Sequence, residues 1–239
     1  MIKLPGLIIA LFVTASAFSQ TTTANKTNLG NRPADHFMIQ LAANFWSGTA
    51  DSVDNYLKGF NRSANVYVML NKPFKGNPKM SAAIGVGVGT ANMYFNKMEV
   101  NITENNTKLP FTRTDTGLNY KKYKLATAFL EIPVELRFTA NPETPNKSIK
   151  GAIGVKVGTL VNAHTKAKGL RTAGGGKINE ATFKASSKSY FNTTRLSVTA
   201  RAGYGIFSLF GSYGLTNVFK DGVAADTKPL QIGITISGL

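Results

Sequence analysis

Apolar and polar positions alternate along most of the chain from residue 36 onward. The clearest run is 149–162, where Ile, Val and Gly at the odd positions face Lys, Ala and Gly at most of the even ones. Successive side chains of a strand point to opposite faces, so each such run predicts a strand with one apolar face. Eight segments show the pattern: 37–46, 61–71, 81–94, 124–138, 149–162, 195–204, 207–216 and 230–237. Each is long enough for a tilted membrane crossing of about ten residues.

The connections between these segments alternate between long and short. In order they are 47–59, 72–79, 96–122, 140–148, 163–189, 204–206 and 217–228. Outer-membrane barrels have tight periplasmic turns and longer outer loops. We therefore expect an all-β fold: a closed antiparallel up-and-down barrel of about eight strands, outer-membrane type. Loops 96–122 and 163–189 are then outside the cell, and we expect both to be mobile.

The first nineteen residues have the features of an export signal. Lys3 precedes an apolar run, Leu7–Val13, and Ala15, Ala17 and Ser19 supply small residues for cleavage. We expect a signal peptide at 1–19 that is cleaved after Ser19, or else after Ala17, with an uncleaved anchor as the alternative. A flexible segment, 20–35, then leads into an outer-membrane barrel domain, 36–239.

Charge and cysteine content exclude several classes of function. The formal net charge is +16, but export argues against a nucleic-acid partner, and the absence of Cys excludes disulfides and thiolate metal sites. Many cations fall in a predicted basic outer loop: Lys166, Lys168, Arg171, Lys177, Lys184 and Lys188. Such a loop suits outer-membrane lipid or lipopolysaccharide, or a protein or glycan partner, while simple solubility is the alternative. The oligomeric state stays open.

A second set of charges alternates with apolar residues and is predicted to share the barrel lumen: Glu131, Glu135, Arg137, Lys150, Lys156, Arg195 and Arg201. Opposite charges in a narrow lumen favour an internal ion-pair network over transport or catalysis, because lone buried charges are costly. Glu131 and Glu135 lie about 13 Å apart along one strand, too far for a paired acid and base.

No cofactor, metal or catalytic site is predicted. The GVGVG run at 85–89 lacks the spacing of a dinucleotide loop. Its alternate glycines instead leave one face of a strand without side chains, which makes room inside a narrow barrel. The two histidines, His36 and His164, have no carboxylate at ligand spacing. Aromatic residues near the predicted strand ends suit either membrane-interface girdles or core packing: Phe37, Phe45, Trp46, Tyr94, Tyr123, Tyr204, Phe207, Tyr213 and Phe219.

The segment FLEIPVELRF at 129–138 resembles a strand of the PorT-like outer-membrane β-barrel proteins of Bacteroidetes. The Gly-rich strand 151–158, the segments 213–219 and 230–234, and the leader ending at 17–20 support this resemblance. It implies a small barrel in the outer membrane. It implies no activity, because the family is named for a member linked to protein secretion and gliding and most members are uncharacterised.

The sequence therefore favours a structural or interaction barrel that acts through its outer loops and is not an enzyme. The alternatives are an accessory of protein secretion or gliding, a narrow channel, and a membrane-embedded enzyme. A soluble calyx for an apolar ligand also stays open, although its outer face should be polar.

Overall fold

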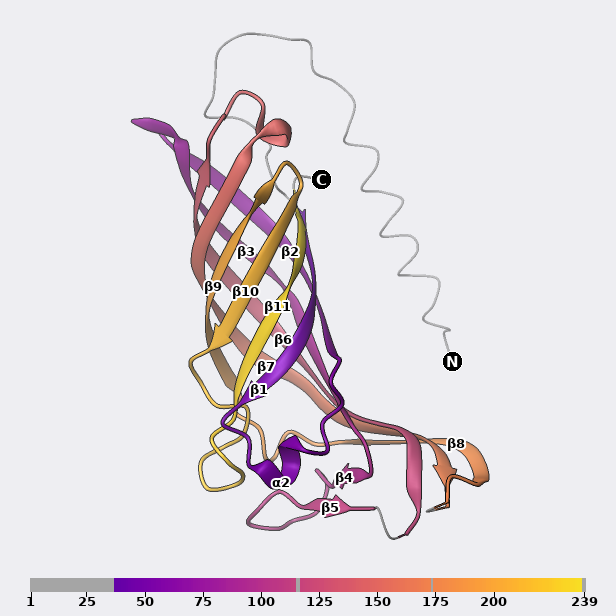
Figure 1. Ribbon diagram of the computed structural model, residues 1–239. Helices are drawn as coiled ribbons and strands as arrows, with labels where there is room; N and C mark the ends of the chain where they lie inside the picture. Colours follow the sequence, from indigo (N-terminus) through magenta and orange to yellow (C-terminus); the bar gives the residue numbers. More distant parts are fainter. Residues whose placement is uncertain (1–36, 115–116, 173, 238–239) are drawn as a thin grey trace, which may run out of the picture.

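The computed structural model describes residues 37–114, 117–172 and 174–237, and its main body is a β-barrel (Figure 1). The predicted signal peptide and the predicted flexible segment 20–35 lie outside these residues, as does His36. The barrel strands are β1 Phe37–Ser47, β2 Asn61–Phe74, β3 Asn77–Phe95, β6 Asn119–Thr139, β7 Ile149–Arg171, β9 Thr194–Tyr204, β10 Phe207–Gly214 and β11 Lys228–Ser237.

These eight strands form one closed antiparallel ring. Their order is β6-β3-β2-β1-β11-β10-β9-β7, and the pairing of β7 with β6 closes it. Every strand therefore pairs with its neighbours in chain order, and β1 pairs with β11. The prediction of a closed, up-and-down, eight-stranded barrel is confirmed.

The two ends of the barrel differ in the length of their connections. Three short connections, 75–76, 140–148 and 205–206, form what we call the turn end; the middle one contains a 3₁₀ turn, η3 Pro145–Lys147. Four long connections form the loop end and carry α2 Asp51–Asp54, β4 Met98–Val100, β5 Phe111–Arg113 and β8 Lys177–Ser186 (Figure 1). Among the described residues, no helix is long and apolar enough to cross a membrane.

The prediction that 163–189 is a loop is wrong for most of its length. β7 continues to Arg171 and pairs with β8, so the segment is a β-hairpin. The alternation of apolar and polar residues stops at 162 because of a register shift. Ala128 pairs with Asn162 but Phe129 pairs with Leu160, which leaves one extra residue in β7. The inward positions change there from even to odd numbers, and Asn162 faces outward instead of inward. The predicted loop 96–122 likewise contains the β4–β5 hairpin and the start of β6.

The barrel is apolar outside and largely polar inside. Each of the eight strands exposes large apolar side chains on its outer face, for example Leu41, Val66, Ile84, Ile132, Ile153, Val198, Leu209 and Ile232. An apolar outer face around a polar interior is the pattern of a barrel surrounded by lipid. It does not fit a soluble calyx, whose outer face would meet water.

The structure also separates the two interpretations of the aromatic residues. Five of them are exposed on the outer wall near the strand ends, as in an interface girdle: Phe37, Phe45, Tyr204, Phe207 and Tyr213. Tyr123 and Phe219 are instead buried at the loop end, and Trp46 packs against the same cluster.

Candidate functional site in the barrel lumen and at the loop end

All seven charged residues of the predicted lumen network lie on three adjacent strands and are at most 8 % exposed. Three come from β6, two from β7 and two from β9: Glu131, Glu135, Arg137, Lys150, Lys156, Arg195 and Arg201. Because these strands are neighbours in the ring, their inward side chains meet. Six of the seven form two groups, each centred on one carboxylate, and Lys150 lies closer to the turn end.

The first group surrounds Glu131 at mid-barrel. Arg195 donates two hydrogen bonds to Glu131 Oε1, one of them from Nε at 3.0 Å. The Tyr67 hydroxyl donates to Oε2 at 2.5 Å, and Lys156 Nζ lies 3.9 Å from the same oxygen. The guanidinium of Arg195 also stacks 4.0 Å above the Phe129 ring. One carboxylate thus holds two cations in place, which stabilises their burial.

The second group surrounds Glu135, nearer the turn end. Arg137 Nε donates to Glu135 Oε2 at 2.8 Å, and Arg201 Nη2 donates to the same oxygen at 3.1 Å. Arg201 also reaches Ser237 Oγ on β11, at 3.4 Å. This group therefore ties β6 and β9 to the last strand of the barrel.

Glycines on the inner face make room for these carboxylates. Gly158 lies opposite Glu131 on β7, and Gly89 of the GVGVG run faces the same carboxylate from β3. A Cβ atom at Gly158 would lie 2.9 Å from Glu131 Cγ, closer than van der Waals contact allows. Gly89 and Gly158 therefore leave the space that the Glu131 side chain occupies, whereas Gly85 and Gly87 lie against Met69 and Tyr67 of β2.

Replacing Gly158 with Val is accordingly expected to destabilise the barrel by about 1–3 kcal/mol, the range for overpacking a filled interior. Unfolding in denaturant, followed by the loss of heat-dependent gel mobility, measures the change. Gly76 is the matched control, since nothing lies within 4 Å of a Cβ atom there. Equal stability of the Gly158→Val and Gly76→Val chains would contradict this role.

The opposite side of the lumen is filled by amides and hydroxyls. Asn65 Nδ2 donates to Gln40 Oε1 at 3.1 Å and to Gln231 Oε1 at 3.3 Å, and Gln40 Nε2 donates to Thr235 Oγ1 at 3.2 Å. Sequence reasoning missed this layer and Tyr67, because uncharged residues at inward positions look like any polar face of a strand. Together with the charged groups it lines the middle of the barrel with buried, hydrogen-bonded side chains.

A cluster of buried apolar residues closes the loop end, and we call it the loop-end plug. Its members come from the strands and from the long connections and include Met93, Phe95, Met98, Val100, Ile102, Leu109, Tyr123, Leu125, Phe129, Leu160, Tyr190, Phe191 and Phe219. Hydrogen bonds fix the connections to it, since Tyr123 Oη donates to the Val100 carbonyl at 2.8 Å and Tyr190 Oη to the Glu104 carbonyl at 2.5 Å. Burial also raises the pKa of the nearby Glu99 carboxyl.

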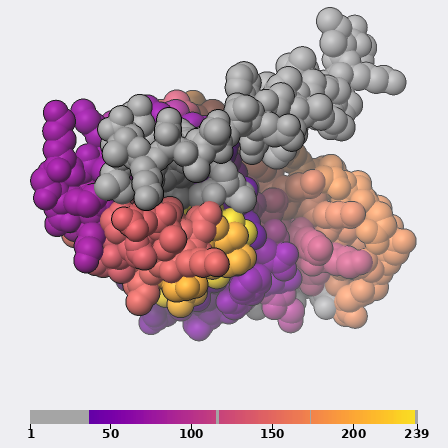
Figure 2. Space-filling view, turned by 90° about the horizontal axis from the view of Figure 1, so that it is seen from above, coloured from indigo at the N-terminus to yellow at the C-terminus, as the bar shows by residue number. Residues whose placement is uncertain are grey.

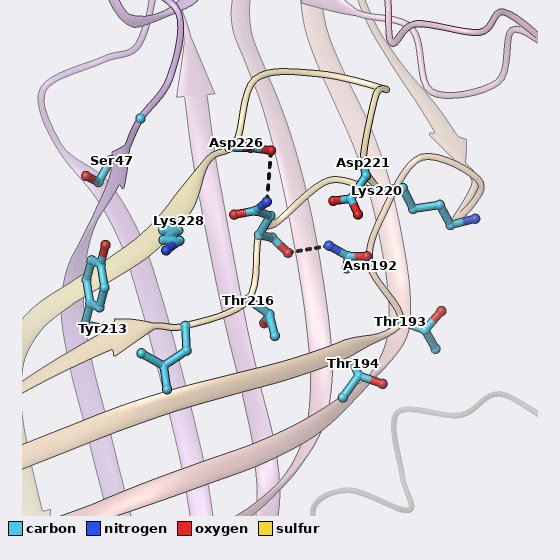
Figure 3. A pocket seen from close by; sticks show the side chains of 13 residues that line it. Ser47, Asn192, Thr193, Thr194, Tyr213, Thr216, Lys220, Asp221, Asp226 and Lys228 are labelled. Carbon is cyan, nitrogen blue, oxygen red and sulfur yellow. Dashed lines mark hydrogen bonds between the residues drawn. The ribbon is translucent and has the colours of Figure 1, made fainter.

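A polar hollow of about 910 Å³ opens beside the plug, and we call it the rim cleft (Figure 3). It is lined by the ends of β1, β9, β10 and β11 and by the 217–227 connection. Asn217 is one of its lining residues: the side-chain Nδ2 donates to Asp226 Oδ1 at 3.0 Å, and the backbone carbonyl accepts from Asn192 Nδ2 at 2.9 Å. Asn217 Oδ1 is buried and has no hydrogen-bond partner among the described residues. Asn217 thus holds the 217–227 connection against Asp226 and Asn192 at the wall of the cleft.

The residues of the predicted basic outer loop lie on the β7–β8 hairpin and just after it. Lys166, Lys168 and Arg171 are on β7, Lys177 and Lys184 are on β8, and Lys188 follows β8. Arg171 and Lys177 both pair with Glu180, at 3.0 and 3.7 Å. Of the two histidines only His164 is described, and the described residues hold no group of three or more His, Asp or Glu side chains placed to bind a metal.

Comparison with known proteins agrees with this architecture. No curated protein matches the chain. A family model described as "Outer membrane protein beta-barrel domain" matches residues 18–220, which include seven of the eight barrel strands, the plug and most of the rim cleft. This chain belongs to the family of outer membrane proteins with that β-barrel domain.

Proposed function

We propose that this protein is a closed outer-membrane barrel that binds a surface glycan through its loop end. The observation that carries the proposal is the rim cleft, which is open and polar, beside a lumen filled with side chains. Long connections of such barrels face outward, so the loop end would meet cell-surface polysaccharide.

The chemistry of the rim cleft suits a ligand rich in hydroxyl groups. It presents the hydroxyls of Thr193 and Thr194, the carboxylate of Asp221, the ammonium of Lys228 and the ring of Tyr213 (Figure 3). These groups supply both donors and acceptors, together with one apolar surface for a sugar ring.

A binding measurement with the polysaccharide part of lipopolysaccharide, released from its lipid, tests the proposal. Thr194→Ala with Asp221→Ala is expected to weaken binding by about tenfold, because each change removes one hydrogen bond to the ligand. Thr112→Ala with Asp54→Ala, at the loop end but outside the cleft, is the matched control. Absence of binding by the unaltered chain, or equal binding by the two double variants, would overturn the glycan assignment.

The other candidate functions have weaker support. A channel would need an open path, whereas small barrels are filled by their own side chains, so no steady current is expected in planar bilayers. The resemblance to PorT-like proteins supports an accessory role in secretion or gliding, but the described residues contain no feature that selects it. We also propose a cleaved signal peptide, 1–19, and no enzymatic activity, since the lumen carboxylates are held by cations.

A further inference from the structure

Four lysines gather on the outer wall of the barrel at the loop end. Lys122 and Lys124 of β6 and Lys166 and Lys168 of β7, with Tyr94 of β3, line a hollow of about 220 Å³. We call this hollow the basic corner. It is formed by strands that do not line the rim cleft.

The lysines of the basic corner oppose one another directly across the strands. Lys124 pairs with Lys166, and Lys122 pairs with Lys168. Lys166 in turn pairs with Lys184 of β8. Like charges in directly opposite positions destabilise a sheet. None of the four corner lysines forms an ion pair with a carboxylate in the described part of the chain. A bound anion would remove this repulsion.

The position of the corner along β6 places it beside the lipid head groups. The positions of β6 on its outward side are apolar from Phe138 to Ala126. At about 3.3 Å per residue and a tilt of about 40°, these positions span about 30 Å, the thickness of the hydrocarbon core of a bilayer. Lys124 is the next position on that side, about 5 Å past the edge of the apolar run, where lysine side chains reach the interface.

The bend of the strands turns the corner toward the membrane surface. The ends of β6 and β7 and the whole of β8 lean sideways from the barrel (Figure 1), and the hairpin protrudes beyond the barrel outline seen from the turn end (Figure 2). The corner lysines lie on the face that continues the outer wall. When the strands bend outward, this face turns toward the lipid surface, so the hairpin overhangs the head groups.

We propose that the basic corner binds the phosphate groups of an anionic glycolipid in the membrane leaflet on the loop side. Lysine is a compact cation that binds phosphate as a point charge. Lys124 is already held in position, because its Nζ donates to Asn92 Oδ1 at 2.6 Å and lies 6.0 Å from the Tyr94 ring. The site goes beyond the proposed glycan binding and depends only on the membrane location.

The test uses the full chain folded in detergent, with bis-phosphorylated lipid A, the same lipid stripped of phosphate, and inorganic phosphate alone as probes. Native mass spectrometry measures lipid retention. We expect the chain to retain the phosphorylated lipid, and K122Q/K124Q/K166Q/K168Q to retain it at least about tenfold less, since each lysine near an anionic surface adds to the affinity. In lipid-free detergent the same variant should unfold at a higher temperature, because the repulsion is gone.

The matched control removes four lysines from the turn end: K72Q/K75Q/K79Q/K147Q. It should retain the lipid as the unaltered chain does. Equal retention by the corner variant, or equal retention of the lipid without phosphate, would overturn the site. Equal stabilisation by inorganic phosphate alone would overturn its assignment to a lipid. These outcomes are independent of polysaccharide binding in the rim cleft.

Discussion

Replacing Glu131 with Gln is expected to destabilise the folded barrel by about 3–5 kcal/mol, the usual effect of removing one partner from a buried ion pair. The neutral amide would leave Arg195 and Lys156 in the lumen without their shared carboxylate. It would also face the Tyr67 hydroxyl with a weaker acceptor, or with an amide donor. The expected loss is large because Glu131 is 1 % exposed, so little water replaces the lost charge.

Heat-dependent mobility on gels and unfolding in guanidinium measure this effect. Glu143→Gln, in the exposed 140–148 turn, is the matched control and should change stability by less than about 0.5 kcal/mol. A triple variant, E131Q/K156M/R195M, should recover much of the loss, because it removes the uncompensated cations together with their partner. Unchanged heat resistance of the Glu131→Gln barrel would show that the charged lumen does not support the fold.

The lumen residues were within reach of sequence reasoning because a strand repeats every two residues. Glu131 and Glu135 are separated by an even number of positions and so share a face, and Lys150 and Lys156 share one in the same way. The pairing of the strands was not needed to find them. What the repeat leaves open is which cation meets which carboxylate, since that depends on register between strands far apart in sequence.

The β7–β8 hairpin was missed because the prediction relied on an unbroken two-residue repeat. A single extra residue at 161 reverses the inward positions of β7, so a search for one continuous alternation ends there. Beyond it, Ala163, Thr165 and Ala167 face inward and Lys166 and Lys168 face outward, a new alternation with the opposite phase. A sequence search that allows one such phase change would have continued the strand through Lys168.

The loop-end plug had no sequence signal of its own. Phe191 and Phe219 lie in connections, where no periodic pattern marks a buried residue. Their burial follows from long-range contacts, such as the bridge between the two residues and the packing of Trp46 on Phe219 with ring centroids 5.5 Å apart. For the same reason, the sequence did not show which aromatic residues face the outer wall and which belong to the loop-end plug.

The barrel therefore has two interiors that are stabilised by different forces. Within the membrane, burying an apolar side chain in the lumen gains little over leaving it in lipid, so ion pairs and hydrogen bonds hold the strands together. Beyond the lipid, the long connections face water, and the hydrophobic effect drives the plug to form. The two interiors touch at Phe129, which belongs to the plug and stacks against Arg195. Perturbing the plug away from Phe129 should still leave the ion pairs largely intact, because sites without shared partners contribute additively.

Replacing Phe95 with Ala tests this separation at the plug. Phe95 is 1 % exposed and packs against the rings of Trp46, Phe111 and Tyr123. Its truncation should cost the loop end about 3–5 kcal/mol, the range for a buried Phe, while the barrel keeps its heat resistance. Hydrogen exchange and tryptic cleavage in 96–114 should both rise.

Phe60→Ala is the matched control, because this ring lies at the same end and is 62 % exposed. It should leave cleavage and exchange in 96–114 unchanged. If Phe95→Ala lowered the heat resistance of the barrel as much as Glu131→Gln does, the plug and the charged lumen would form one cooperative unit. Loss at the loop end alone would instead mean that the connections can loosen while the ring of eight strands stays closed around its ion pairs.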